Sequence, residues 1–391
     1  MVNSVPAPTS WIEVDARAYR HNIDFIRTMI GPDVRFCSVV KGNAYGHGID
    51  TMVRLGDHAG VSEYGVYSAD EAYEVHRCND RPKRIMIMGN LWDDELEWAI
   101  ENDVSFFVFS KQRLDQAQSL AAKIGKAAQV HLEIETGMNR TGIGIHELDH
   151  FIGIISSHPE QLRWAGLCTH FAGAESIANY LRVKKQFVLF RKILKHVKKT
   201  WPQVPESIHT ACSAAALRYP STHYDLVRIG ILQYGFFPSR EVQVEYMATQ
   251  DDSHVYPLRR IVSWKSRVMD IKSVHTGEFI GYGTSYLSNS PMRIASIPVG
   301  YAHGFSRSLS NQGRVLIGGQ QAKVVGMVNM NMIQADVTGI PEVQAGDEVV
   351  LIGRQGDQEI SVSSFAEYSD QVNYELLTRL PHNIPRIIKN L

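Results

Sequence analysis

Cysteine is scarce in this chain: four residues in 391, with no close pair among them. The four are Cys37, Cys78, Cys168 and Cys212. This spacing excludes a disulfide framework and a zinc or redox motif, so we interpret them as reduced thiols and predict no metal site. No apolar run reaches the ~18 residues that span a bilayer, and the N-terminal residues lack the charged and apolar regions of a secretory signal. We therefore predict a cytoplasmic protein without a membrane partner.

Neither sign of charge is in excess. Lysine and arginine number 40 against 41 acidic residues, which gives a net charge of −1. No basic surface is expected to attract nucleic acid or anionic lipid. The expected partners are a small molecule and a second copy of the chain.

The first part of the chain predicts a parallel sheet. From about residue 14 to 237, short apolar runs alternate with longer amphipathic stretches, as strands alternate with helices. The predicted strands include residues 35–40, 84–88, 104–109, 130–134 and 164–168. About eight such units fit into some 230 residues. The chain contains no G-x-G-x-x-G loop, the motif that would favour an open dinucleotide-binding sheet. We therefore predict a closed (β/α)8 barrel.

After about residue 246 the sequence pattern changes from alternating apolar and amphipathic stretches to short alternating segments, which predicts a second, mostly β domain. Short alternating segments at 262–270, 293–299, 322–328 and 348–352 are separated by glycine-rich turns. We place the two domains at residues 1–245 and 246–391. Residues 11–14 are a candidate strand that pairs with the second domain rather than with the barrel.

The segment Phe36–Gly48 is the most informative about chemistry. An apolar run that favours a strand ends just before Lys41, and a glycine-rich loop follows the lysine. A lysine at the end of a buried strand loses hydration, which lowers its pKa and frees the neutral amine to form a Schiff base with a carbonyl cofactor such as pyridoxal phosphate (PLP). The alternative is a lysine that extends from the strand end into solvent. Arg140, His170 and Ser213 also follow predicted strands, where barrels place their chemistry.

Within this segment, V-V-K-G-N-A-Y-G-H-G (residues 39–48) resembles the PLP-lysine signature of the alanine racemases, with Gly42 where alanine is usual. The resemblance implies that Lys41 holds PLP and acts as a proton-transfer base, and that Tyr45 lies near the cofactor phosphate. It runs from about residue 10 to the C-terminus. It implies PLP as cofactor, a homodimer with shared active sites, interconversion of L- and D-alanine, and a role in cell-wall biosynthesis.

A second motif lies at Thr136–Gly142, T-G-M-N-R-T-G, which resembles the family's T-G-M-x-R-x-G. Its arginine, here Arg140, is implied to contact the phenolic oxygen of the cofactor and the substrate carboxylate. Seven residues earlier, Glu133 stands where many members carry a carbamylated lysine. An anion within about 4 to 6 Å would hold the guanidinium, so we predict that Glu133 replaces the carbamate. The alternative is a strand glutamate that faces solvent.

Two further stretches, 209–216 and 227–235, resemble the phosphate-binding and pyridine-binding parts of the family. Ser213 and the backbone N–H groups of Gly230 and Ile231 are implied to bind phosphate, and His170 and His209 to belong to the same cofactor site. Arg228 is implied to bond to the pyridine nitrogen. Because an arginine keeps its proton, that nitrogen stays unprotonated and the ring is a weaker electron sink, which limits transamination. The alternative pairs Arg228 with Asp225.

The second domain carries the remaining motifs. Ile280–Tyr286 resembles the catalytic tyrosine loop, which in the family comes from the partner subunit. A racemase needs bases on opposite faces of Cα, and we predict Lys41 and Tyr282. Tyr301, in the stretch 300–304, and the backbone N–H of Met330 are implied to contact substrate. The alternative for either tyrosine is a place in the core.

Further positions in the second domain depart from the family pattern. His303 and Asn331 stand where aspartate is usual, and His382 stands where a tyrosine narrows the pocket. The pocket would then differ in size and polarity, so serine or a larger amino acid is an alternative to alanine.

Two other functions remain open at this stage. A PLP decarboxylase of the same architecture would carry a run of glycines for phosphate and a C-terminal cysteine-aspartate pair, and the sequence has neither. A noncatalytic PLP carrier would need only the barrel, and the tyrosines of the second domain disfavour it.

Overall fold

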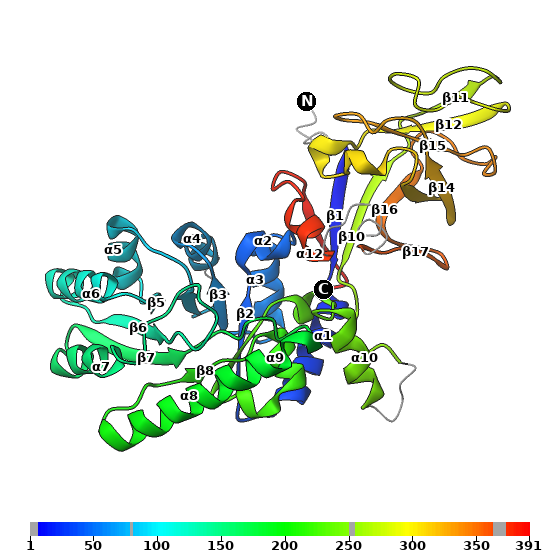
Figure 1. Ribbon diagram of the computed structural model, residues 1–391. Coiled ribbons are helices and arrows are strands. Elements are labelled where there is room, and N and C mark those ends of the chain that lie inside the picture. Colours follow the sequence, from blue (N-terminus) through cyan, green and yellow to red (C-terminus); the bar gives the residue numbers. More distant parts are fainter. Residues whose placement is uncertain (1–6, 79–80, 250–254, 363–372) are drawn as a thin grey trace. The chain divides into compact units, whose positions relative to one another are not determined.

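The computed structural model describes residues 7–78, 81–249, 255–362 and 373–391 (Figure 1). The chain divides into two compact units. The barrel unit comprises Ala18–Lys41 and Met52–Arg260, and the β unit comprises Met1–Arg17, Gly42–Thr51 and Ile261–Leu391. The domain limits drawn from the sequence, 1–245 and 246–391, stay a prediction.

The barrel unit is built on a parallel sheet of eight strands among the described residues. The strands are β2 (Arg35–Val39), β3 (Glu63–Val66), β4 (Arg84–Ile87), β5 (Ser105–Val108), β6 (Ala128–Glu133), β7 (Leu162–Cys168), β8 (Ile208–His209) and β9 (Leu226–Ile229). Their order is β8-β7-β6-β5-β4-β3-β2-β9. The two ends of this order also meet, because Asp225 N–H donates to the Ile208 carbonyl at 3.0 Å and Arg228 N–H to the Ala211 carbonyl at 2.9 Å. The prediction of a (β/α)8 barrel is confirmed.

Helices separate these strands along the chain, and Figure 1 shows α4 to α8 outside the strands. The helices are α1 (Ala16–Ile30), α3 (Ile49–His58), α4 (Ala69–Arg77), α5 (Asp93–Glu101), α6 (Lys111–Ile124), α7 (Leu148–Ser157), α8 (Tyr180–Thr200), α9 (Ser213–Arg218) and α10 (Arg240–Ala248), with 3-10 turns η1 (Ile177–Asn179), η2 (Pro220–Thr222) and η3 (Ile231–Tyr234). Helix α6 illustrates their local origin. Ser110 Oγ accepts from Arg113 N–H at its start, and Gly125 ends it with a φ of 75°.

Burial of the strands follows from this arrangement. All four residues of β5 and of β9 are buried. A parallel strand has one face toward the barrel interior and the other under the helices, so both faces are removed from water. Polar residues on such strands must therefore bond to one another, which matters for the site.

The β unit is mostly antiparallel. Its strands are β1 (Ser10–Asp15), β10 (Val262–Arg267), β11 (Asp270–Val274), β12 (Met292–Ile297), β13 (Arg314–Ile317), β14 (Gln320–Val324), β15 (Ile333–Asp336), β16 (Glu348–Gln355), β17 (Gln358–Ile360) and β18 (Arg386–Lys389). The order is β11-β12-β15-β14-β13-β16-β10-β1-β18, and β17 pairs with β16. Shorter elements are α2 (Lys41–Tyr45), η4 (Tyr301–His303), η5 (Arg307–Leu309) and α12 (Asn373–Thr378). The prediction of a mostly β second domain is confirmed.

Strand β1 belongs to this unit. It pairs antiparallel with β10 and parallel with β18, and Figure 1 shows it beside β10. Every second residue of β1 is buried, as expected where one face of a sheet packs on a core. Among the described residues, no helix is both long enough and apolar enough to cross a membrane.

Candidate functional site

Lys41 follows the end of β2, as predicted from the sequence. The backbone before it is held firmly, because Val40 N–H donates to the Gly65 carbonyl at 2.9 Å and Tyr234 OH donates to the Val39 carbonyl at the same distance. Gln233, which is fully buried, donates to the Val39 carbonyl as well, at 3.0 Å. The strand end that presents the lysine is thus fixed from both neighbouring strands.

The electrostatic surroundings of Lys41 favour the neutral amine. Desolvation lowers its pKa, and the positive charges of Arg140 and Arg228 lower it further. The residue itself is accessible to solvent. The surrounding protein nevertheless removes water from the charged form of the amine, which is why the pKa falls. An accessible amine with a lowered pKa is suited to attack a carbonyl carbon.

Arg228 lies on β9 and is buried, with 4% of its surface exposed. Its guanidinium donates to the Thr169 carbonyl at 2.9 Å, to the His209 carbonyl at 3.0 Å and to Nδ1 of His209. The alternative pairing with Asp225 is wrong, because the Asp225 carboxylate instead accepts from Ile208 N–H at 2.7 Å.

His170, after β7, joins the same cluster. Its Nδ1 lies 3.5 Å from Nη2 of Arg228. Burial lowers the pKa of His170 to about 3, and the charges of Arg228, Arg140 and Lys41 act in the same direction. The ring is therefore neutral at physiological pH. Arg228, Arg140 and Lys41 are all close enough to His170 to affect its pKa. The structure therefore brings these predicted residues of the barrel unit to one end of the barrel.

Ser213 begins α9, and its Oγ accepts from Gly230 N–H at 3.0 Å. Ile231 follows as the first residue of η3. The hydroxyl and these backbone positions therefore come from the ends of two adjacent strands, β8 and β9. Strand β9 also pairs with β2, which leads to Lys41.

Arg140 lies in the loop after β6 and is exposed. Glu135 shapes this loop: its carboxylate accepts from the N–H groups of Gly137, Met138 and Asn139, the last two at 2.7 Å. Sequence reasoning missed Glu135. The available signal was an acidic residue directly before T-G-M, where successive N–H groups need an acceptor.

Glu133, at the end of β6, is 4% exposed, so the alternative of a solvent-facing glutamate is wrong. Its Oε2 has no hydrogen-bond partner among the described residues. Burial raises the pKa of Glu133, whereas the Thr141 hydroxyl and the charges of Arg228 and Arg140 oppose that rise.

In the β unit, the loop after Lys41 makes a turn of left-handed helix. The φ angles of Asn43, Ala44 and Tyr45 are 52°, 53° and 54°. Such angles cost roughly 1–2 kcal/mol for each residue with a side chain, so other bonds must hold them. Asn43 supplies two: its carbonyl accepts from Gly48 N–H at 2.9 Å and its Oδ1 from Ile49 N–H at 3.2 Å.

Arg386 joins this loop to the C-terminal segment. Its guanidinium donates to the Gly46 carbonyl at 2.8 Å and to the carbonyls of Pro381 and His382 at 2.7 and 3.1 Å. The side chain of His382 is exposed. Tyr45 and His382, both predicted near the cofactor phosphate, are thus carried by two loops that one half-buried arginine holds.

The tyrosine motifs of the β unit form a second group. Tyr301 N–H donates to the Asn329 carbonyl and Ala302 N–H to the Met330 carbonyl, both at 3.0 Å. His303 Nδ1 accepts from Gly300 N–H at 3.2 Å, a bond that an aspartate could also make. The exposed fractions of Tyr301 and Met330 are 42% and 56%, and Asn331 is also exposed.

Tyr282 stands at the tip of a hairpin loop and is 74% exposed. The loop is closed by Ile280 N–H, which donates to the Tyr286 carbonyl at 3.0 Å. Neither Tyr282 nor Tyr301 is a core residue, so that alternative is wrong for both.

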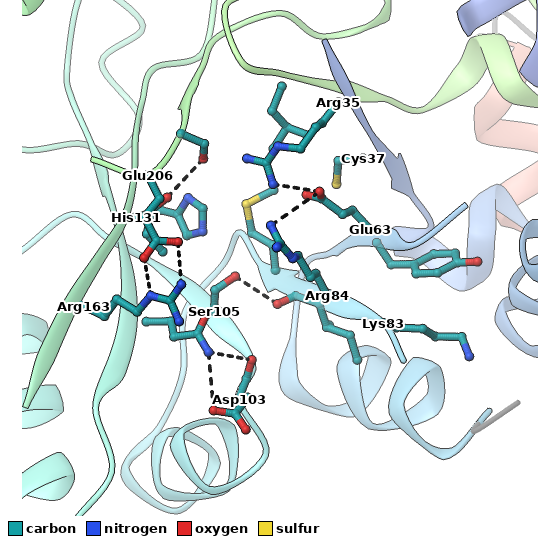
Figure 2. Close-up of a pocket in the computed structure, with 17 residues that line it drawn as sticks. Arg35, Cys37, Glu63, Lys83, Arg84, Asp103, Ser105, His131, Arg163 and Glu206 are labelled. Carbon is teal, nitrogen blue, oxygen red and sulfur yellow. Dashed lines mark hydrogen bonds and ion pairs between the residues drawn. The ribbon is translucent and has the colours of Figure 1, made fainter. Parts of the chain in front are cut away.

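A cavity of about 340 Å³ lies at the other end of the barrel, where the strands begin (Figure 2). Charged residues line it in pairs: Glu63 accepts from Arg35 at 2.8 Å, and Glu206 accepts from Arg163. It contains neither Lys41 nor Arg228. The catalytic candidates are therefore at the opposite strand ends, and His131 reaches this cavity from the barrel interior.

Comparison with known proteins agrees with this geometry. The family model "Alanine racemase, N-terminal domain" matches residues 14–238, and "Alanine racemase, C-terminal domain" matches residues 261–388. The chain belongs to the alanine racemase family. The alanine racemase of Leptospira interrogans is 34% identical over 381 residues, which cover 97% of this chain and 96% of that protein. That of Halothermothrix orenii is 34% identical over 390 residues, 100% and 99% of the two chains.

Solved alanine racemases have the same fold. The structure from Bacillus anthracis with bound L-Ala-P is 33% identical, with a TM-score of 0.88 over 99% of this chain and 96% of that one. The Clostridium difficile 630 enzyme is 27% identical, with a TM-score of 0.88 over 98% and 97%. Family membership leaves the decarboxylase and the noncatalytic carrier without support.

Proposed function

We propose that this protein interconverts L- and D-alanine with PLP as its cofactor. The observation that carries the proposal is the Lys41 amine, which has a lowered pKa and lies at a barrel end with Arg140 and Arg228. Relatives along the whole chain are alanine racemases.

The donor groups of the barrel unit fit PLP. An amine suits its aldehyde, a buried guanidinium suits its ring nitrogen, and a hydroxyl with backbone N–H groups suits its phosphate. Lys41, Arg228 and Ser213 offer these groups from adjacent strands, with Gly230 and Ile231 beside Ser213. Tyr45 and His382 of the β unit are further candidates for the phosphate, and His170 and His209 for the walls of the cofactor site.

When bound, PLP supplies an electron-withdrawing ring that acidifies the Cα–H bond of the amino acid. The residues of the protein must then move one proton. We assign Lys41 Nζ to one face of Cα and the Tyr282 hydroxyl oxygen to the other, because racemisation removes a proton from one face and returns one to the opposite face. Arg228 holds its own proton throughout, since arginine does not titrate in proteins.

Substrate orientation falls to Arg140, whose guanidinium can bind a carboxylate with two hydrogen bonds. Glu133 is the anion proposed to steady it. Support comes from the burial of Glu133, from the unpartnered Oε2, and from the effect of the Arg140 charge on its pKa. Tyr301 and the backbone N–H of Met330 are proposed to contact the substrate from the β unit.

A homodimer with shared active sites completes the proposal. The 74% exposure of Tyr282 supports this proposal, because its hydroxyl is accessible to a second copy of the chain. Each site would then combine Lys41 of one subunit with Tyr282 of its partner.

Substrate range is the one place where a second candidate has support. The exposed polar side chains of His382 and Asn331, together with the half-buried His303, replace the residues usual in the family. Serine or a larger polar amino acid is therefore the second candidate.

The test is chiral analysis of the amino acid after incubation with a single enantiomer. With PLP added, the purified protein should convert L-alanine to D-alanine and the reverse, without release of carbon dioxide. Borohydride should fix the cofactor to the peptide that contains Lys41, and Lys41→Ala should abolish both results. Failure to racemise any amino acid, with PLP bound, would refute the function.

A further inference from the structure

Three buried polar side chains form a continuous file across the barrel interior. His131 comes from β6, His209 from β8 and Arg228 from β9. Nδ1 of His131 lies 2.8 Å from Nε2 of His209, and Nδ1 of His209 bonds to the Arg228 guanidinium. Their exposed fractions are 6%, 0% and 4%. The file thus leads to the arginine assigned to the cofactor ring nitrogen.

The bonds of this file fix where each proton sits. A guanidinium can only donate, so Nδ1 of His209 must accept and carries no proton. The neutral ring of His209 then holds its proton on Nε2 and donates it to Nδ1 of His131. Nδ1 of His131 is therefore also unprotonated, and the proton of His131 is on Nε2.

Both rings are neutral. Burial lowers the pKa of His131 to about 3, and burial together with Arg228 lowers the pKa of His209 well below its usual value. If His209 were doubly protonated, its Nδ1–H would face an N–H of the Arg228 guanidinium. Two donors and two positive charges would then lie against each other. The file therefore contains one positive charge, on Arg228.

Packing prevents the rings from turning aside. A Cβ atom at Gly166 would lie 2.1 Å from Nδ1 of His131, so only glycine leaves room for this bond. The ring centroid of Phe107 lies 6.1 Å from that of His131 and 6.0 Å from that of His209. Cζ of the Arg228 guanidinium lies 6.0 Å from the same phenyl centroid. The phenyl ring thus contacts all three members of the file.

We propose that His131 is a positioning residue: by accepting from His209 it fixes the tautomer of His209, which in turn keeps Arg228 aimed as a donor to the cofactor ring nitrogen. His131 does not touch the cofactor, and the assignment of Arg228 rests on the proposed function. If His209 moved its proton to Nδ1, two donors would face each other and the guanidinium would be displaced.

His131 also lines the cavity at the far end of the barrel, and Figure 2 shows it there beside Glu206. The file therefore extends from that cavity to the catalytic end. The hydrogen bonds that orient Arg228 come from the barrel interior. The sequence motifs of the catalytic loops do not predict these bonds.

The test uses two variants of matched size. His131→Asn retains an acceptor near the position of Nδ1, whereas His131→Leu has nearly the same shape and no acceptor. The tautomer of His209 is read by 15N NMR of the imidazole nitrogens in the cofactor-free protein, with His209→Gln to assign its signals. PLP affinity is measured by titration for the native protein and both variants.

The native protein and His131→Asn should show the His209 proton on Nε2. His131→Leu should lose this single tautomer and bind PLP at least roughly fivefold more weakly than His131→Asn, because a buried donor has lost its acceptor. A proton on Nδ1 of His209 in the native protein overturns the proposal, even if the leucine variant does not fold. Equal PLP affinity of the two variants also overturns it. Because the tautomer is read without cofactor, a failure of the racemase assignment would not be confused with a failure of this proposal.

Discussion

The buried side-chain amide of Gln233 donates to the carbonyl of Val39, two residues before Lys41, at 3.0 Å. The same amide donates to the Ile229 carbonyl at 3.1 Å, and its Oε1 accepts from Ser38 Oγ at 2.6 Å. One side chain after β9 thus satisfies polar groups at the ends of two adjacent strands. The position of the proposed cofactor lysine depends on it.

Replacement of Gln233 should therefore lower stability. In Gln233→Met the volume is nearly kept, but the carbonyls of Val39 and Ile229 lose a buried donor, which costs about 2–4 kcal/mol. Urea unfolding gives the free energy directly. Gln112→Met, on an exposed face of α6, is the matched control and should change stability by less than about 0.5 kcal/mol. Similar losses in both variants would contradict this account.

The lowered pKa of Lys41 predicts selective acylation in the cofactor-free protein. Desolvation is the largest cause of this lowered pKa, and the charge of Arg140 is the second. Arg140→Met should therefore raise the pKa of Lys41. Less neutral amine would then be present at pH 8, and Lys41 should react several-fold more slowly. The measurement is peptide mass spectrometry over a pH series, with exposed Lys198 as internal reference. Arg191→Met, on α8, should leave the rate unchanged; an equal effect would refute the charge assignment.

Tyr282→Phe should keep PLP bound and lose most turnover in both directions. The phenyl ring retains the packing but has no oxygen to accept a proton. Both directions must fall together, because the variant cannot change the equilibrium between enantiomers. Initial rates from L- and D-alanine test this, and normal turnover would mean that another residue is the second base.

Mixing of two inactive variants tests whether the site is shared. Lys41→Ala and Tyr282→Phe subunits should together recover up to about a quarter of the native activity. Half of randomly mixed dimers are hybrids, and one of the two sites in each hybrid holds both bases. Native mass spectrometry should establish subunit exchange first. If exchange is complete and activity stays absent, both bases come from one chain.

The buried histidines predict a loss of stability in mild acid. The folded-state pKa of His131 is about 3, whereas a histidine in an unfolded chain titrates near 6.5. As pH falls below about 6.5 the unfolded chain binds a proton that the folded protein does not, so the free energy of unfolding falls until the folded pKa is reached. One such histidine contributes roughly 1.4 kcal/mol per pH unit.

Urea unfolding between pH 7.5 and 5 measures this slope. His131→Asn should reduce it by the share of one histidine. An unchanged slope in His131→Asn would mean that the ring is protonated in the folded protein.

The substrate preference should depend on His382. A pocket contact of this size is worth about 1–3 kcal/mol, which is roughly tenfold or more between two amino acids. The comparison is kcat/KM for alanine, serine and longer polar amino acids in the native protein and in His382→Tyr. If the native protein strongly prefers alanine and the substitution leaves the ratios unchanged, His382 does not set specificity.

The segments that the sequence singled out as strands each overlap a strand of the structure, in both units. The apolar run 35–40 is β2 (Arg35–Val39), and 348–352 is the first part of β16 (Glu348–Gln355). Burial of alternate or successive apolar residues is a local pattern, so it can be read without coordinates. The position of Lys41 at a strand end follows from the same pattern.

Other features have no local pattern. Asn43, Ala44 and Tyr45 adopt positive φ angles that alanine and tyrosine rarely take, because Arg386, more than 300 residues away, and Asn43 itself bind the loop. Gly46 is required because a Cβ there would lie 1.8 Å from the Leu377 carbonyl oxygen. The sequence identifies the glycine and cannot identify its neighbour.

What the sequence determined by itself is therefore the barrel, the β unit and the chemical identity of the catalytic candidates, because side-chain periodicity and short motifs encode them. Only the tertiary structure decided which partners hold those candidates. His131 and His209 are 78 residues apart in the sequence and form one 2.8 Å hydrogen bond. Most buried polar groups find a hydrogen-bond partner, and for His131 and His209 that partner lies across the barrel interior, at a distance along the chain that no local pattern specifies.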